Sequence, residues 1–167
     1  MKQLMRLMGY LGPYKRSMAV AVLLLLIETC FELVIPVIMA DIIDIGVEQR
    51  NVSVIMSKGI QMGICAVLAL VTGLLYARFA AQASYGLGAR IREAQYEKVQ
   101  DYSFSNLDHF DTSSLVTRMT TDVTVIQNSI NGGLRPMIRG PVMLIMGIGL
   151  SIWMNVRLAV VFLVTAP

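Results

Sequence analysis

Residues 59–77 read GIQMGICAVLALVTGLLYA and contain no charged side chain. As a helix rising 1.5 Å per residue, this run is about 28 Å long. The hydrocarbon core of a bilayer is about 30 Å thick. The sequence stays apolar past Arg78 to about Ser84. We therefore predict a membrane-spanning helix over residues 59–84.

Other long apolar runs flank this one. We predict spans over 18–43 and 136–156 by the same criterion of length. A fourth run starts at residue 158 and reaches Pro167 after about ten residues, which is too few to cross a bilayer. We therefore expect the 167 residues to be either a fragment of a longer protein, with further spans and a nucleotide-binding domain, or a truncated product.

The composition supports a membrane protein. Hydrophobic residues make up 56% of the chain and charged residues 15%, with a mean hydropathy of +0.65. Soluble domains have about 45–50% apolar and about 25% charged residues. The net charge of +3 does not indicate a nucleic-acid-binding protein. Cys30 and Cys65 lie within apolar runs, so we expect small buried side chains and no metal site.

The positions of lysine and arginine predict the orientation, because these residues favour the cytoplasmic side of a span. The basic residues before the first span are Lys2, Arg6, Lys15 and Arg16. Those between the second and third spans are Arg90, Arg92, Lys98, Arg118 and Arg135. We therefore predict a multi-pass protein of the plasma membrane, with its N-terminus and residues 85–135 in the cytoplasm.

The N-terminal 16 residues precede the first span. Leu4, Leu7, Met8 and Leu11 recur at helical spacing ahead of the break at Gly12-Pro13. This pattern favours a short helix on the inner membrane surface, and a frayed tail is the alternative. We expect residues 1–16 to form this helix and residues 17–167 a partial transmembrane domain.

Residues 85–135 form an unusually long polar connection. Residues 89–102 are rich in charges and helix formers and lack proline, so the second span is predicted to continue as one helix into the cytoplasm. After a break at 103–113, a helical pattern resumes over 115–130 and leads into the third span. We predict two helices that form a cytoplasmic stalk and meet at a short polar elbow.

The elbow, residues 104–123, reads FSNLDHFDTSSLVTRMTTDV. It resembles the first intracellular loop of ATP-binding-cassette exporters, in which Phe-Asp is followed by Ser/Thr-Arg-x-Thr-x-Asp-Val. The likeness extends over essentially the whole chain. Other positions that fit the family are Gly86, Ile91, Arg92 and Tyr96 upstream, and Trp153, Arg157, Leu158 and Pro167 downstream. The glycine usual in the family's elbow is Ser114 here, as in members that work as heterodimers.

The resemblance implies an all-α membrane protein, an incomplete six-helix exporter domain with a coupling helix at about 113–117. That helix would contact a nucleotide-binding domain, and a second transmembrane half, in a homodimer or a heterodimer, would complete the transporter. The residues that the resemblance assigns to coupling are Phe110, Asp111, Ser113, Ser114, Leu115, Arg118 and Asp122. Phe110 would anchor the interface or pack between the stalk helices. Arg118 and Asp122, four residues apart, can pair along the helix. The pair would either hold the elbow for its partner domain or be an exposed pair worth only a few tenths of a kcal/mol.

No catalytic motif accompanies the elbow. The chain lacks Gly-x4-Gly-Lys-Ser/Thr, so it has no loop that would cradle phosphates. The single histidine, His109, has no serine or cysteine partner at a recognisable spacing. We predict no enzyme activity for this chain alone. ATP and Mg²⁺ would bind the nucleotide-binding domain, and the intact transporter would be an ATPase.

Two acidic residues interrupt the first span. Glu28 and Glu32 are one helical turn apart, and a lipid-facing charge at the bilayer centre costs about 2.5–3.5 kcal/mol. Both are therefore expected to face the protein interior, where they could form a cavity wall for cationic, partly apolar substrates. The alternative is a structural pair neutralised by a neighbour, and Arg78 is the candidate partner of Glu28.

Two other classes of protein fit parts of the pattern. A membrane-bound signalling protein would use long helices to reach an output module, but the stalk turns back into the membrane after about 50 residues. A small scaffold that binds other membrane helices would require the run after Arg157 to end in the middle of the membrane. The sequence favours a subunit or fragment of an ATP-driven exporter over both.

Overall fold

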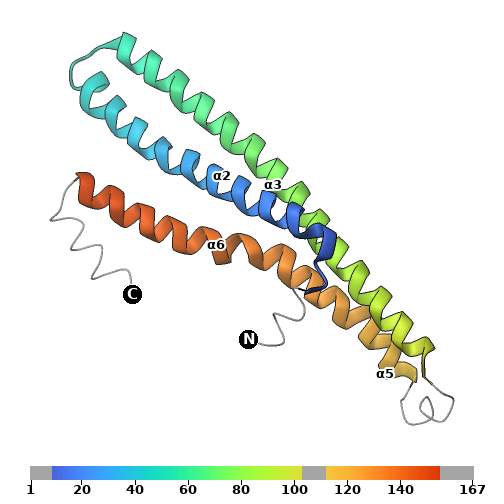
Figure 1. Ribbon diagram of the computed structural model, residues 1–167. Helices are drawn as coiled ribbons and strands as arrows, with labels where there is room; N and C mark the ends of the chain where they lie inside the picture. Colours follow the sequence, from blue (N-terminus) through green and yellow to red (C-terminus); the bar gives the residue numbers. More distant parts are fainter. Residues whose placement is uncertain (1–8, 103–111, 155–167) are drawn as a thin grey trace. The chain divides into compact units, whose positions relative to one another are not determined.

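The computed structural model describes residues 9–102 and 112–154, and all the regular structure in these residues is helical (Figure 1). This confirms the all-α prediction. In chain order the elements are η1 (Gly12–Tyr14), α2 (Lys15–Asp41), η2 (Ile42–Val47), α3 (Val52–Gln100), α5 (Thr112–Thr117), η3 (Arg118–Asp122) and α6 (Val123–Met154). The element η1 is a 3-10 helix, whereas η2 and η3 are π-helical.

The chain divides into two units, which are described separately. The first comprises Met1–Ala21 and Ala77–Arg135, and the second comprises Val22–Tyr76 and Pro136–Pro167. Helices α2, α3 and α6 each contribute residues to both units. The predicted stalk falls in the first unit, and the intramembrane acidic residues fall in the second.

Helix α3 is a single element of 49 residues. At 1.5 Å per residue it is about 73 Å long, more than twice the thickness of a hydrocarbon core. It begins after Asn51, whose Oδ1 accepts hydrogen bonds from the backbone N–H groups of Ser53 (3.1 Å) and Val54 (3.4 Å). No proline interrupts α3. The prediction that the second span continues past residue 84 as one helix is therefore confirmed, and the position of this continuation in the cytoplasm stays a prediction.

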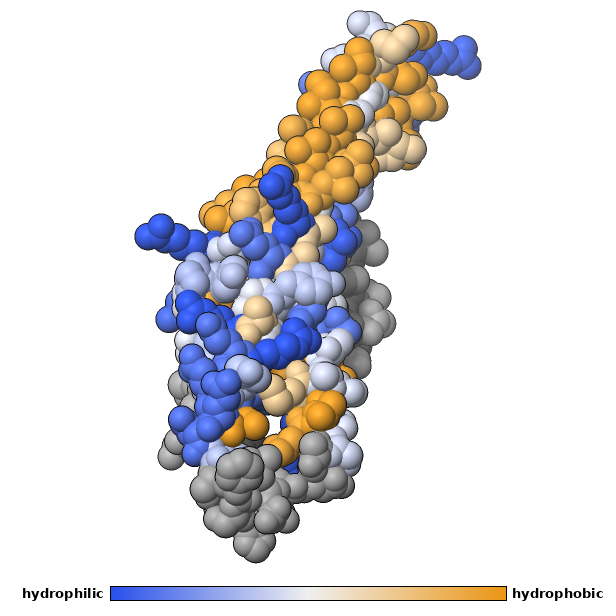
Figure 2. All heavy atoms as spheres, turned by 90° about the vertical axis from the view of Figure 1, so that its right-hand side faces the viewer, coloured by the Kyte–Doolittle hydropathy of each residue, from blue (hydrophilic) through white to orange (hydrophobic). Residues whose placement is uncertain are grey.

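Two helical stretches of the described chain are long and apolar enough to cross a membrane, Gly12–Val47 and Val52–Gln100. Their large hydrophobic side chains are widely exposed, for example those of Leu23, Ile60 and Leu70. Figure 2 shows such side chains covering a continuous stretch of one face. A surface of this kind suits contact with lipid. The span predicted at 136–156 overlaps α6 and stays a prediction.

One cysteine differs from expectation. Cys65 is partly buried, but Cys30 is exposed, so the prediction that both are buried was wrong for Cys30. The physical reason is that an apolar residue on a membrane helix need not face the protein, because lipid accepts it equally well.

The first unit has a compact hydrophobic core. Leu11, Leu87, Ile91 and Val123 are buried together, and Met18, Ile126 and Ile130 pack against them. This core joins the start of the chain to α3 and α6. Ser84 adds a buried hydrogen bond, because its Oγ–H donates to the carbonyl of Gln127 at 2.6 Å. The stalk helices are thus held together by both apolar packing and polar contacts.

Gly86 allows Tyr14 to pack closely on α3. A Cβ built at Gly86 would lie 2.5 Å from Cε1 and Cζ of the tyrosine ring. We expect Gly86→Ala to destabilise the protein by about 1–3 kcal/mol, the usual cost of overpacking. Thermal unfolding in detergent measures the change. Gly63→Ala is the matched control, since a Cβ there meets nothing within 4 Å. Equal melting temperatures for the two variants would contradict the close contact.

Helix α5 runs directly into η3 and α6. Thr117 and Val123, which flank η3, both have α-helical backbone angles. Thr117, Thr120 and Thr124 each donate a side-chain hydrogen bond to the carbonyl four residues earlier. The helix predicted at 113–117 is therefore present as α5, but it forms the first turns of a longer helical segment. No proline or glycine between Thr112 and Val123 would end it.

Candidate functional site

The elbow residues lie at the start of this helical segment. Ser113, Ser114, Arg118 and Asp122 are exposed, and Leu115 is partly buried. An exposed polar surface at the end of a long helix is accessible to another protein domain. Phe110, Asp111 and His109 lie outside the described residues, so their predicted roles stay predictions.

Arg118 and Asp122 form no ion pair with each other among the described residues. Arg118 instead lies on the side of η3 that faces α3, where it lines a pocket. The described residues thus show no pairing along the helix, and a role of Arg118 and Asp122 in holding the elbow for a partner domain stays a prediction.

This pocket, here called the stalk pocket, lies between α3 and the segment α5–η3 in the first unit. Its volume is about 150 Å³. The polar side chains that line it are Gln95, Lys98, Tyr102 and Arg118. Its apolar wall is formed by Val99, Leu115 and Met119. The pocket brings part of the predicted elbow together with residues of α3 that sequence reasoning had not singled out.

The spacing of the lining residues explains how the pocket forms. On α3 they are at 95, 98, 99 and 102, and on α5–η3 they are at 115, 118 and 119. Intervals of three, four and seven place side chains on one face of a helix. The spacing thus places each set of residues as a stripe on one face of its helix, but the sequence alone does not show that the two faces meet.

Outside the pocket, Arg92 of α3 contacts the start of α6. Its Nη2 donates to Oγ1 of Thr124 at 3.0 Å. Arg90, also on α3, approaches Glu93 only at 4.0 Å, and both side chains are more than half exposed. Of these two arginines, Arg92 thus connects α3 to α6, whereas Arg90 forms a weak surface pair.

The second unit contains a polar cluster within its apolar helices. Glu28 is 4% exposed, and a Cβ built at Gly73 would lie 2.9 Å from its Oε1. The glycine therefore makes room for the carboxyl group against α3. The neighbouring Thr29 is also buried and donates its Oγ1–H to the carbonyl of Leu25 at 2.8 Å. Glu28 faces the protein, as the cost of lipid exposure requires.

Glu32 has a partner on α6. Its Oε2 lies 2.5 Å from Nη2 of Arg139, and the two side chains are 28% and 32% exposed. The contact is an ion pair between opposite charges and not a hydrogen bond, because Oε2 has no hydrogen-bond partner of acceptable geometry. Sequence reasoning missed Arg139, although this arginine directly precedes the uncharged run 140–156. The sequence did contain a signal for this pair, because Glu32 lies within one predicted span and Arg139 lies at the edge of another.

Arg78 is exposed and belongs to the first unit. Its pairing with Glu28, which lies in the second unit, stays a prediction. A substrate cavity formed by Glu28, Glu32 and Arg78 stays a prediction for the same reason.

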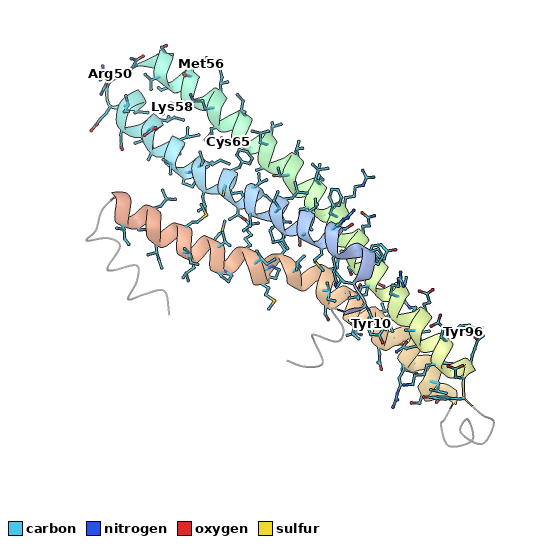
Figure 3. All side chains as sticks on the ribbon, in the orientation of Figure 1. Tyr10, Arg50, Met56, Lys58, Cys65 and Tyr96 are labelled. Atoms are coloured by element: carbon cyan, nitrogen blue, oxygen red, sulfur yellow. The ribbon has the colours of Figure 1, made fainter. Side chains whose placement is uncertain are left out.

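A further ion pair lies near the turn between α2 and α3. Nζ of Lys58 is 2.6 Å from Oδ2 of Asp41 (Lys58 is labelled in Figure 3). Both side chains are partly exposed. Among the described residues, no cluster of three or more His, Cys, Asp or Glu side chains could hold a metal ion.

Comparison with known proteins identifies the family. Residues 18–167 match the family model for the ABC transporter transmembrane region. The chain therefore belongs to the ABC transporter transmembrane family. This agrees with the resemblance found at the elbow.

Among its relatives is the uncharacterized ABC transporter ATP-binding protein YfiB of Bacillus subtilis, which is 36% identical over 96% of this chain and 28% of YfiB. The putative export ATP-binding/permease protein RT0691 of Rickettsia typhi is 26% identical over 99% of this chain and 29% of RT0691. The chain thus spans less than a third of the length of these relatives.

Proposed function

We propose that the chain forms part of the transmembrane region of an ATP-driven exporter and transmits movement to and from a nucleotide-binding domain through residues 112–122. Family membership is the observation that carries the transport role. The direction of transport is supported by relatives such as RT0691, whose name describes a putative export protein.

The geometry of the first unit supports a coupling role. Helix α3 continues far beyond the length that a bilayer needs, and α5–η3 presents exposed polar residues beside its end. Helices suit this task because they move as rigid bodies in alternating access. The nucleotide-binding domain, with its ATP and Mg²⁺, and a second transmembrane half are the partners in this proposal.

Cysteine cross-linking at Ser114 tests the proposal. In membranes from cells that express the complete reading frame, we expect a cysteine at Ser114 to cross-link to a nucleotide-binding domain. The yield should change at least threefold when ATP is added, because closure of two such domains moves the stalk.

A cysteine at Val125 provides the matched control, because this residue is also exposed but lies on α6 beyond η3. We expect little cross-linking there. Normal membrane insertion with no link from Ser114 to a nucleotide-binding domain would refute the coupling role.

A further inference from the structure

The stalk pocket is not explained by contacts within the described chain. It opens between α3 and α5–η3, and its volume is about 150 Å³, the size of a cavity that can hold a benzene molecule. A single side chain from another domain would fill such a space.

The charged residues that line the pocket indicate which chemical group it would bind. Lys98 and Arg118 both line it, whereas none of the lining residues is acidic. Acidic residues occur nearby on the same helices, at Glu97, Asp101 and Asp122, but they do not line the pocket. Two cations without a lining counterion favour a carboxylate, and arginine can bind one through two parallel hydrogen bonds.

Gln95 supplies a second requirement. Its Oε1 is buried in the wall of the pocket and has no hydrogen-bond partner among the described residues. A buried acceptor without a donor costs about 1–3 kcal/mol. An occupant that offers a hydrogen-bond donor as well as a carboxylate would therefore be preferred over a simple anion.

We propose that the stalk pocket receives an aspartate or glutamate side chain of the nucleotide-binding domain. The carboxylate pairs with Lys98 and Arg118, and a backbone N–H of the same segment donates to Gln95. The methylene groups of the acidic side chain contact Val99 and Met119. This inference rests on the proposed function and adds a second contact, in which the nucleotide-binding domain inserts into the stalk.

A peptide fits these features better than a free anion does. Inorganic phosphate would meet the two cations, but it has no apolar part for the wall formed by Val99, Leu115 and Met119. A peptide segment combines a carboxylate, a backbone N–H donor and apolar carbon atoms.

Zero-length cross-linking tests the contact in membranes from cells that express the complete reading frame. A carbodiimide activates a carboxylate, and the lysine amine then displaces the urea to form an amide bond. The expected product joins Lys98 to an aspartate or glutamate of the nucleotide-binding domain, identified by mass spectrometry of the digested protein. Lys58 and Asp41, 2.6 Å apart, serve as an internal positive control.

Matched variants define specificity. Lys98→Arg should abolish the product, because a guanidinium does not couple. Gln95→Leu should lower the yield about fivefold, the effect expected from losing one hydrogen bond of about 1 kcal/mol. Tyr96→Lys, tested together with Lys98→Arg, places the amine on an exposed residue of α3 that does not line the pocket (Figure 3) and should give at least fivefold less product.

The outcomes separate this inference from the proposed function. A link from Ser114→Cys to the nucleotide-binding domain, together with a Lys98 link to an acidic residue of that domain, supports both. The Ser114 link without any Lys98 product, or with Lys98 joined to the transmembrane chain itself, overturns the acidic contact alone. Loss of both links overturns both proposals.

Discussion

Replacing Arg139 with alanine is expected to lower the amount of folded protein in the membrane severely. The substitution leaves the Glu32 carboxylate without its partner 2.5 Å away, in an apolar helix. A charge without compensation in the bilayer centre costs about 2.5–3.5 kcal/mol, which corresponds to a roughly 70- to 400-fold shift in the folding equilibrium. Thermal unfolding in detergent and the yield of inserted protein measure the effect.

The reciprocal variants identify the ion pair as the cause. Glu32→Gln combined with Arg139→Gln should recover most of the loss, because it removes both charges. Glu32→Arg with Arg139→Glu should recover part of it. Arg90→Ala is the matched control, since the Arg90 pair is exposed and such pairs contribute about 0–1 kcal/mol. An Arg139→Ala protein as stable as Arg90→Ala would refute a structural role for the pair.

Leu87→Ala is expected to destabilise the stalk by about 2–5 kcal/mol, the range measured for large-to-small changes in packed cores. Leu87 is 1% exposed and belongs to the cluster with Ile91 and Val123, so its removal leaves a cavity where α3 meets α6. Thermal unfolding and protease sensitivity of the cytoplasmic part measure the loss.

Leu70→Ala distinguishes core packing from hydrophobicity alone. Leu70 lies on the same helix but is 62% exposed, so its truncation creates no internal cavity. We expect a change below about 1 kcal/mol for this variant. Equal losses for Leu87→Ala and Leu70→Ala would show that the cluster is not a packed core.

The long helices were predictable because their signals are local. The uncharged run 59–77 and the proline-free continuation to 102 predicted the path of α3. The short helix near the elbow followed from the sequence motif, and α5 occupies that position. These features depend on length, hydropathy and spacing along one helix.

Features that depend on how helices face one another were harder to predict. For the acidic residues of the first span, the sequence offered a candidate partner only for Glu28, namely Arg78, and that pairing stays a prediction. The partner observed for Glu32 is Arg139, which the sequence reasoning had not named. Depth in the membrane can be estimated from the sequence, whereas rotation about the helix axis decides which side chains meet. The stalk pocket illustrates the same limit, because each stripe is visible alone and the pocket exists only where the two stripes face each other.

Helices α2, α3 and α6 all continue across the boundary between the two units, and α3 and α6 differ there in their backbone hydrogen bonding. On α3 it falls between Tyr76 and Ala77, within an unbroken ladder of backbone hydrogen bonds. On α6 it falls at Pro136, which lacks the N–H that would bind the carbonyl of Gly132. The backbone hydrogen-bond ladder of α6 is therefore interrupted at Pro136, whereas that of α3 continues through Tyr76 and Ala77.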